Sequence, residues 1–201
     1  MNRTDRRKRE TNERILDAAF ELFLAQGIAA TTIEQICEQA DVANRTFFNH
    51  FTTRQVMIQA LAERRFANLH DAMLARDDQP VPQRIVGVFD DIAVSLTKSS
   101  TTYREIIGEM MSTTGYGGQR GSGLHQAFLD LLTDGVARGE VNTAHDPTTL
   151  ADIMASTLAG GIANWAVDSK YSLKRNLHNS ALALADLLTR QRRHADPPGS
   201  T

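Results

Sequence analysis

The stretch Thr31–Phe51, TTIEQICEQADVANRTFFNHF, constrains the fold of this chain more than any other. Thr31 and Glu34 have the spacing of a capping box, which predicts the start of a short helix with one apolar face. Asp41 stands where the chain must turn, because a short polar side chain tolerates turn dihedrals. A second short helix follows, with phenylalanines on one side. The stretch therefore predicts two short helices joined by a tight turn.

The outward side of the second helix is predicted to carry Asn44, Arg45, Thr46 and Asn49. An arginine can make a bidentate contact with guanine, an asparagine can do so with adenine, and Thr46 can reach a phosphate or a thymine methyl. A short helix braced by a first one, with such side chains near its N-terminus, is typical of major-groove recognition. The alternative is that these are ordinary solvated side chains.

Residues 11–57 resemble the helix-turn-helix of TetR-family transcriptional regulators. An amphipathic helix ends in a G-x-x-x-T-T connection, Gly27–Thr32, and the two short helices follow. An aromatic–x–x–Phe–x–x–Lys/Arg run, Phe48–Arg54, comes next. The resemblance implies an all-α fold, in which an N-terminal three-helix helix-turn-helix domain is joined by a long helix to a C-terminal helical domain for ligand binding and dimerisation.

The resemblance also implies roles for single residues. Arg54 stands at the usual Lys, where its charge and the start of the next helix would hold a phosphate. His50 would approach a phosphate or pack at the helix end. Phe48 lacks the hydroxyl of the usual Tyr, and Ala43 lacks that of the usual Ser cap, which leaves Asn44 as the substitute cap. The expected DNA contacts are Thr32, Asn44, Arg45, Thr46, Phe48, Asn49, His50, Arg54, Arg6, Arg7, Lys8 and Arg9.

Residues 1–9, MNRTDRRKR, form a basic run with the single acid Asp5. The formal net charge of the chain is −2, so DNA binding must come from local charge. We expect this run to be a disordered arm that becomes partly ordered on DNA, along phosphates or in the adjacent minor groove. The alternative is that its charged residues extend the helix that begins near Thr11.

Apolar residues recur at helical spacing along the rest of the chain, and no alternating strand pattern is visible. Thr53, Asp146-Pro147 and Gly139 have the positions of two helix starts and one helix end. The expected helices span about 11–26, 53–76, 83–98, 102–112, 124–138, 146–168 and 172–193. We expect a helix-turn-helix domain over 10–54, a ligand-binding and dimerisation domain over 55–193, and a disordered tail over 194–201.

The C-terminal region offers a candidate ligand pocket and a candidate dimer interface. Adaptable Met and aromatic side chains suit a mainly hydrophobic ligand, although such stripes also form plain core. The candidate pocket residues are Phe66, Phe89, Tyr103, Met110, Met111, Phe128, Met154 and Trp165. By resemblance the last two helices would form a homodimer, with Leu158, Leu177, Leu184 and Leu188 at the interface, or these leucines would pack inside one subunit.

Other functions have less support in the sequence. The glycine-rich loop 115–123 lacks the Gly-Lys-Ser/Thr ending of a phosphate-binding loop, and the six histidines have no metal-ligand spacing. We therefore expect no enzyme, metal or cofactor, and neither a signal peptide nor a membrane span, which favours the cytoplasm. The expected function is a repressor released from a palindromic operator by a small hydrophobic ligand. Activation stays possible, and a helical adaptor without specific DNA binding is the alternative.

Overall fold

The computed structural model describes residues 2–74, 78–98, 101–113, 123–142 and 144–189, without the side chains of residues 65–74 and 113. Every regular element in these ranges is a helix, which confirms the all-α prediction. The helices are α1 (Arg3–Gln26), α2 (Ile33–Gln39), α3 (Asn44–His50), α4 (Arg54–Leu74), α5 (Val81–Thr97), α6 (Thr101–Thr113), α7 (Gly123–Ala137), α8 (Pro147–Val167) and α9 (Leu173–Thr189). Among the described residues, no helix is long and apolar enough to cross a membrane.

The first helix begins at Arg3, so the prediction of a disordered arm is wrong for residues 3–9. The reason is local: these residues include no glycine or proline, and Arg and Lys are good helix formers. Asn2 caps the start, since its Oδ1 accepts from the backbone N–H of Thr4, and Arg6 pairs with Glu10 one turn on, at 3.4 Å. The basic run is thus the first part of a 24-residue helix.

The turn between Gly27 and α2 is capped one residue later than predicted. Thr32 is the N-cap of α2, and its side chain and that of Gln35 bond each other's backbone N–H at 3.2 and 2.8 Å. Thr31 is instead buried, and its hydroxyl donates to the carbonyl of Gly27 at 2.8 Å. The structure therefore replaces the predicted Thr31–Glu34 capping box with Thr32–Gln35.

The turn between α2 and α3 carries backbone strain where the sequence predicted a turn. Asp41 has a φ of 52°, a left-handed conformation that few residues other than glycine adopt. Ala43 is the N-cap of α3 and makes no side-chain bond, while Asn44 is already inside the helix. Asn44 is therefore not the substitute cap, and its amide stays available on the surface.

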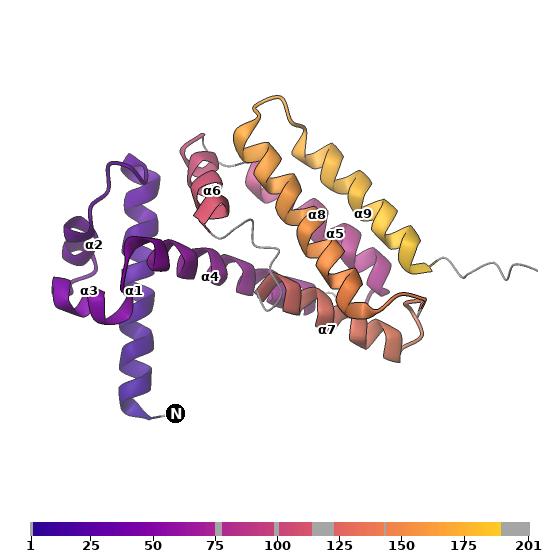
Figure 1. The fold of residues 1–201 in the computed structure, drawn as a ribbon, viewed down its shortest axis with the longest axis horizontal. Helices are drawn as coiled ribbons and strands as arrows, with labels where there is room; N and C mark the ends of the chain where they lie inside the picture. Colours follow the sequence, from indigo (N-terminus) through magenta and orange to yellow (C-terminus); the bar gives the residue numbers. More distant parts are fainter. Residues whose placement is uncertain (1, 75–77, 99–100, 114–122, 143, 190–201) are drawn as a thin grey trace, which may run out of the picture.

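The long helix α4 connects the two parts of the molecule (Figure 1). Thr53 caps it as predicted, because its hydroxyl oxygen accepts from the backbone N–H of Val56 at 3.2 Å. Helices α1–α3 lie at the first half of α4, where α1 packs against it, and α5, α6 and α7 of the C-terminal part contact α4. The break predicted between residues 77 and 82 ends two residues earlier than expected, because α5 begins at Val81 and holds Pro82 in its first turn, where proline needs no hydrogen-bonded N–H.

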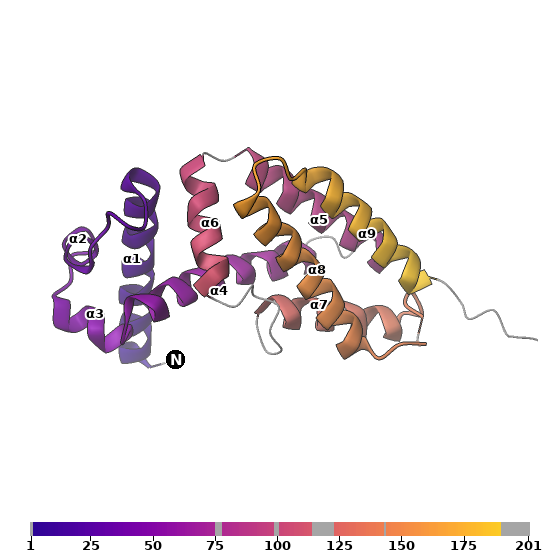
Figure 2. The same cartoon turned by 45° about the horizontal axis from the view of Figure 1, so that its top comes forward.

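The C-terminal part is a bundle in which α5 lies along α9 and α7 along α8. Helix α6 stands between α1 and α8, as the second view shows (Figure 2). Asp146 caps α8, where its carboxylate accepts from the backbone N–H of Thr149 at 3.0 Å, and Gly139 ends the α7 segment with a φ of 72°. Both positions confirm the sequence prediction. The glycine-rich loop and the tail 194–201 lie outside the described residues, except for Gly123.

One glycine of α7 is required by packing. A Cβ on Gly135 would lie 2.7 Å from methyl groups of both Val81 and Val141. These side chains are β-branched and buried, so they cannot turn aside. We expect Gly135→Ala to lower the free energy of unfolding by about 1–2 kcal/mol, despite alanine's better helix propensity.

Urea unfolding followed by circular dichroism measures this change. Gly108→Ala in α6 is the matched control, because the added Cβ would meet the Cβ of Ala166 at 3.4 Å, an ordinary van der Waals distance. The control is expected to be neutral or to stabilise by up to about 1 kcal/mol. An unchanged unfolding midpoint for Gly135→Ala would show that α7 can move away from the two valines.

Candidate nucleic-acid interface

Helix α3 is anchored on one side and open on the other. Phe47 and Phe51 are buried at 0% and 3% exposure, so they fix the helix in the core of the helix-turn-helix. Asn44, Arg45 and Asn49 are exposed, and Thr46 is half-buried. This division places the predicted base-reading side chains together on the outer surface. The geometry suits entry into a groove about as wide as a helix.

An aromatic side chain extends the open face of α3. Phe48 is 49% exposed and meets the buried Phe47 edge to face, with the ring centroids 5.4 Å apart. Single exposed apolar side chains are common on protein surfaces, so what matters for Phe48 is its place beside the exposed polar side chains of α3. Without a hydroxyl, the ring can touch a thymine methyl or a sugar but cannot donate to a phosphate. Thr32, also exposed, uses its hydroxyl oxygen as the α2 cap.

The structure places the charge of Arg54 inside the domain rather than toward a phosphate. Its guanidinium donates to the backbone carbonyls of Ile28 and Thr31 and lies 5.6 Å from the ring centroid of Phe23. The planar fork of arginine matches two neighbouring carbonyl acceptors. Arg54 therefore ties the start of α4 to the end of α1, a role that resemblance did not indicate.

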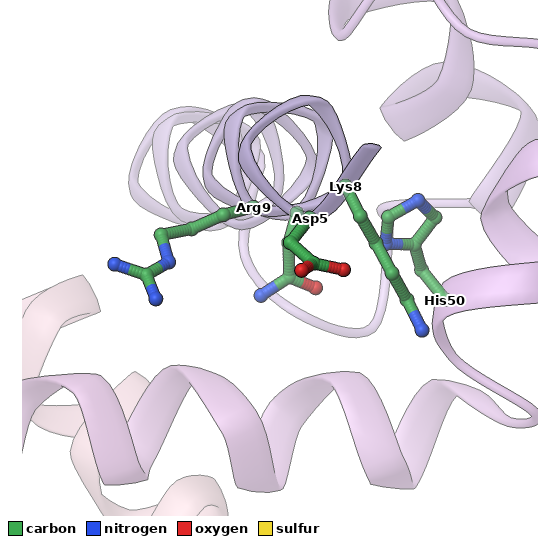
Figure 3. A pocket seen from close by; sticks show the side chains of 5 residues that line it. Asp5, Lys8, Arg9 and His50 are labelled. Carbon is green, nitrogen blue, oxygen red and sulfur yellow. The ribbon is translucent and has the colours of Figure 1, made fainter. Parts of the chain in front are cut away.

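One face of the extended α1 meets the end of α3. Asp5, Lys8, Arg9 and Asn12 recur at spacings of three and four residues and line an open cleft together with His50 (Figure 3). Burial, followed by the positive charge of Lys8, lowers the pKa of His50 below its usual value. Asp5 and Asn12 were missed by the sequence prediction, because their shared face exists only when the helix extends to Arg3.

A cluster of ion pairs holds α4 against α1. The Nη1 atom of Arg64 lies 2.9 Å from a carboxylate oxygen of Glu13 and 2.8 Å from one of Asp17. The side chain of Arg64 is 24% exposed, whereas those of Glu13 and Asp17 are 48% and 63% exposed, so solvent reaches both acids. Sequence reasoning missed it, since nothing along the chain relates residues on separate helices. Together with Arg54, it fixes the angle at which α4 leaves the helix-turn-helix.

The predicted pocket residues do not all face one place. Phe89 and Phe128 meet with ring centroids 6.1 Å apart, and both are buried with Met154. Tyr103 of α6 instead contacts Phe20 of α1 edge to face, at 6.0 Å. The remaining candidates are Met110, Met111 and Trp165, which are buried, and Phe66, whose side chain lies outside the described residues.

The contact between α6 and α1 continues toward α8. Arg104, next to Tyr103, donates to the backbone carbonyl of Trp165 and lies 5.1 Å from the centroid of that ring. Two adjacent side chains of α6 thus touch the helix-turn-helix on one side and the end of α8 on the other. This arrangement links the two parts of the chain at a point separate from α4.

The four leucines predicted at a dimer interface are packed inside one subunit. Leu158, Leu177, Leu184 and Leu188 are 0%, 1%, 7% and 1% exposed. Leu177 lies against Gly161, where an added Cβ would come within 2.6 Å of its Cδ2. Helix α9 lies along α5 and beside α8 in the same chain, so the leucines are covered without a second subunit. The apolar side chains that α8 and α9 turn outward are Ile153, Val167 and Leu182.

Comparison with known proteins identifies relatives of both the N-terminal part and the whole chain. Residues 15–61 match the family model of bacterial regulatory proteins of the tetR family. An uncharacterized HTH-type transcriptional regulator of Bacillus subtilis, YvkB, is 42% identical over 60 residues, which are 30% of this chain and 32% of YvkB. The chain thus spans a third or less of the length of the curated relatives that it matches at 40% identity or more.

More distant relatives match over most of their length. The HTH-type transcriptional repressor BepR of Brucella suis is 27% identical over 179 residues, 82% of this chain and 85% of BepR. FadR of Thermus thermophilus, a TetR-family repressor whose structure was solved in complex with lauroyl-CoA, superposes with a TM-score of 0.69 at 17% identity. That match covers 94% of this chain and 100% of FadR, so the two share one fold.

Proposed function

Because this chain belongs to the TetR family of bacterial transcriptional regulators, we propose that it represses transcription by binding a palindromic operator as a homodimer. A small, mainly hydrophobic ligand releases it. The observation that carries the DNA-binding part is the open face of α3, where Arg45 and Asn49 stand exposed above the buried Phe47. Nothing in the packing of the domain requires these polar side chains.

In the proposed complex, α3 enters the major groove. Arg45 pairs with guanine, Asn44 and Asn49 contact adenine, and Phe48 touches a thymine methyl. Thr46 lies closer to the domain and contacts a phosphate. The exposed basic residues of α1, among them Arg6 and Arg7, add contacts to the backbone that position the domain without reading sequence.

Selection of bound sequences from random duplex DNA tests this proposal. We expect a two-fold symmetric site whose half-sites are centred one helical turn apart, about 34–36 Å. Affinity for that site should fall steeply as salt increases, because the contacts to phosphates release counterions. Enrichment of no sequence at moderate salt would exclude sequence-specific regulation and favour the helical adaptor.

The proposed homodimer places the outer faces of α8 and α9 against those of a second copy. Ile153, Val167 and Leu182 are 42%, 84% and 48% exposed in the single chain. Gly160 adds a position on α8 where nothing lies within 4 Å of a Cβ, so a second backbone could approach closely there. One short recognition helix reads too few base pairs for useful specificity, and a two-fold partner doubles the site.

Placing a charged side chain on the outer face of α8 and α9 tests the proposed dimer. We expect Leu182→Glu to convert the dimer to a monomer, because two carboxylates would be buried against apolar surface across the two-fold axis. Light scattering after size-exclusion chromatography measures the mass. The control is Leu24→Glu, at a leucine of α1 that is 39% exposed and does not belong to either helix of the proposed interface. A dimeric Leu182→Glu protein would place the interface elsewhere.

Ligand release is proposed to act through α4 and α6. A ligand among α5–α8 would shift these two helices, which contact α1 through Arg64 and through Tyr103. The ligand must bind the released arrangement more tightly than the DNA-bound one, or no release follows. The buried apolar residues around Phe89 and Phe128, and the acyl-CoA bound by the similar FadR, support a hydrophobic ligand. Lauroyl-CoA is the first probe for release of the selected operator.

A further inference from the structure

The cleft between α1 and α3 is a polar feature of the described surface that base recognition by α3 does not explain. It has a volume of about 340 Å³ and is open to solvent. In Figure 3 the side chain of Lys8 runs alongside the ring of His50, the carboxylate of Asp5 points into the same space, and Arg9 extends away from His50. Two elements that are far apart in the sequence therefore bring a cation, an imidazole and an acid together.

The chemistry of the lining suits a singly charged oxyanion. Lys8 supplies a compact positive charge, and the Asn12 amide and the His50 ring can each donate a hydrogen bond. In the part of the chain that the structure describes, Lys8 has no ion-pair partner, whereas Arg6 on another face of the helix is paired with Glu10. Asp5 is the only acid in the lining and opposes anion binding.

We propose that this cleft binds one phosphodiester group of the DNA backbone, held by Lys8, Asn12 and His50, and that Asp5 limits the strength of binding. The proposal rests on the proposed function and deepens it. The basic segment is helical from Arg3, so it presents side chains along a fixed face. It therefore does not enter the minor groove as an extended arm. The end of α3 and the start of α1 then hold the same DNA strand, and this sets the angle at which α3 enters the major groove.

The position of His50 in the cleft makes phosphate binding depend on pH. In the free protein, burial and the positive charge of Lys8 lower the pKa of His50, so the neutral ring is favoured over the imidazolium. A phosphate in the cleft favours the charged imidazolium and raises this pKa, so binding takes up a proton. The charged groups that line the cleft with His50 are Lys8, Asp5 and Arg9, all from α1, and Arg9 extends away from His50; no described side chain of α4 lines the cleft. DNA affinity should therefore rise as pH falls from about 7.5 to about 6.

The experiment measures fluorescence anisotropy of the full chain on the duplex that the wild type selects, and on a random-sequence duplex at low salt. We expect Lys8→Met to weaken binding about tenfold on both duplexes and to reduce the salt slope by about one per subunit. We expect Asp5→Asn to tighten binding several-fold. We expect His50→Gln to remove the pH dependence. These side chains lie at or near the surface, and circular dichroism checks that the variants fold.

Two charge-matched controls distinguish a contact in the cleft from the general electrostatic effect of changing the charge of α1. Arg3→Met removes the same charge as Lys8→Met, and Glu10→Gln the same charge as Asp5→Asn, but neither residue lines the cleft. Duplexes with a single neutral methylphosphonate locate the contact. When the methylphosphonate replaces the phosphate that Lys8 contacts, at one position in each half-site, the wild type and Lys8→Met should bind the duplex with equal affinity.

The outcomes for the cleft and for the regulator are distinct. If Lys8→Met and Asp5→Asn match their controls on the random-sequence duplex, the phosphate site is overturned, whether or not an operator was selected. If the wild type selects no sequence while Lys8 still acts locally, the cleft stands and the proposed function fails, because contacts to phosphates do not depend on sequence. An effect of Lys8 that survives every methylphosphonate substitution also overturns the site.

Discussion

Replacing Arg45 with alanine is expected to weaken binding to the selected operator by about 10–100-fold for each half-site, or about 1–3 kcal/mol. Arg45 is exposed on the open face of α3 and makes no contact that the fold needs. Its loss should therefore change the free energy of unfolding by less than about 0.5 kcal/mol. A dimer uses Arg45 twice, so the fold-change in affinity for the whole operator is the product of the fold-changes at its two half-sites.

The specificity of the variant is as informative as its affinity. Binding of Arg45→Ala to duplexes with each base at each position should show relaxed preference at one position per half-site, where the wild type requires guanine. Lys98→Ala is the control, because this exposed cation stands in the C-terminal part, just after α5. Unchanged affinity together with unchanged base preference would mean that α3 does not read bases through Arg45.

Replacing Arg54 with methionine is expected to lower the free energy of unfolding by about 2–5 kcal/mol. The methionine stem can still cover Phe23, but the carbonyls of Ile28 and Thr31 lose their shared donor. Each unsatisfied carbonyl costs about 1–3 kcal/mol where water cannot replace the lost bond. The free energy of unfolding of Arg54→Lys should lie between those of the wild type and Arg54→Met, since a single ammonium does not reproduce the planar fork of the guanidinium.

Urea unfolding and operator binding together distinguish the two roles of Arg54. Packing inside the domain predicts a loss of stability, with weaker DNA binding only as a consequence. Contact with a phosphate, as family resemblance suggested, predicts wild-type stability and a reduced salt slope for the variant. The second pattern would show that the guanidinium leaves its two carbonyls when DNA is present.

The sequence predicted most of the helices because their signals are local. Thr53, Asp146 and Gly139 mark helix ends through bonds or dihedrals within a few residues, and the structure confirms all three. The capping box was misplaced by one residue for a tertiary reason. Thr31 faces α1 and is buried, so Thr32 is the residue left to cap α2. Both threonines fit the pattern, and only packing distinguishes them.

The candidate site was predicted in part. The outward face of α3 follows from helical spacing, since Phe47 and Phe51 must face the core and leave Arg45 and Asn49 outside. The cleft that joins Asp5 and Asn12 to His50 was not predicted. A run of like charges is typical of a disordered tail, so the composition of residues 1–9 gave no sign of the helix that begins at Arg3.

The sequence by itself determined the kind of molecule: an all-α chain with a helix-turn-helix and an outward reading face, because helical periodicity and capping act over a few residues. Only the tertiary structure decided what the long charged side chains do. Arg54 ties α4 to α1, Arg64 joins Glu13 and Asp17, and Lys8 stands beside His50. An arginine or lysine reaches several ångströms in any direction, so its partner depends on how helices that are distant in the sequence pack together.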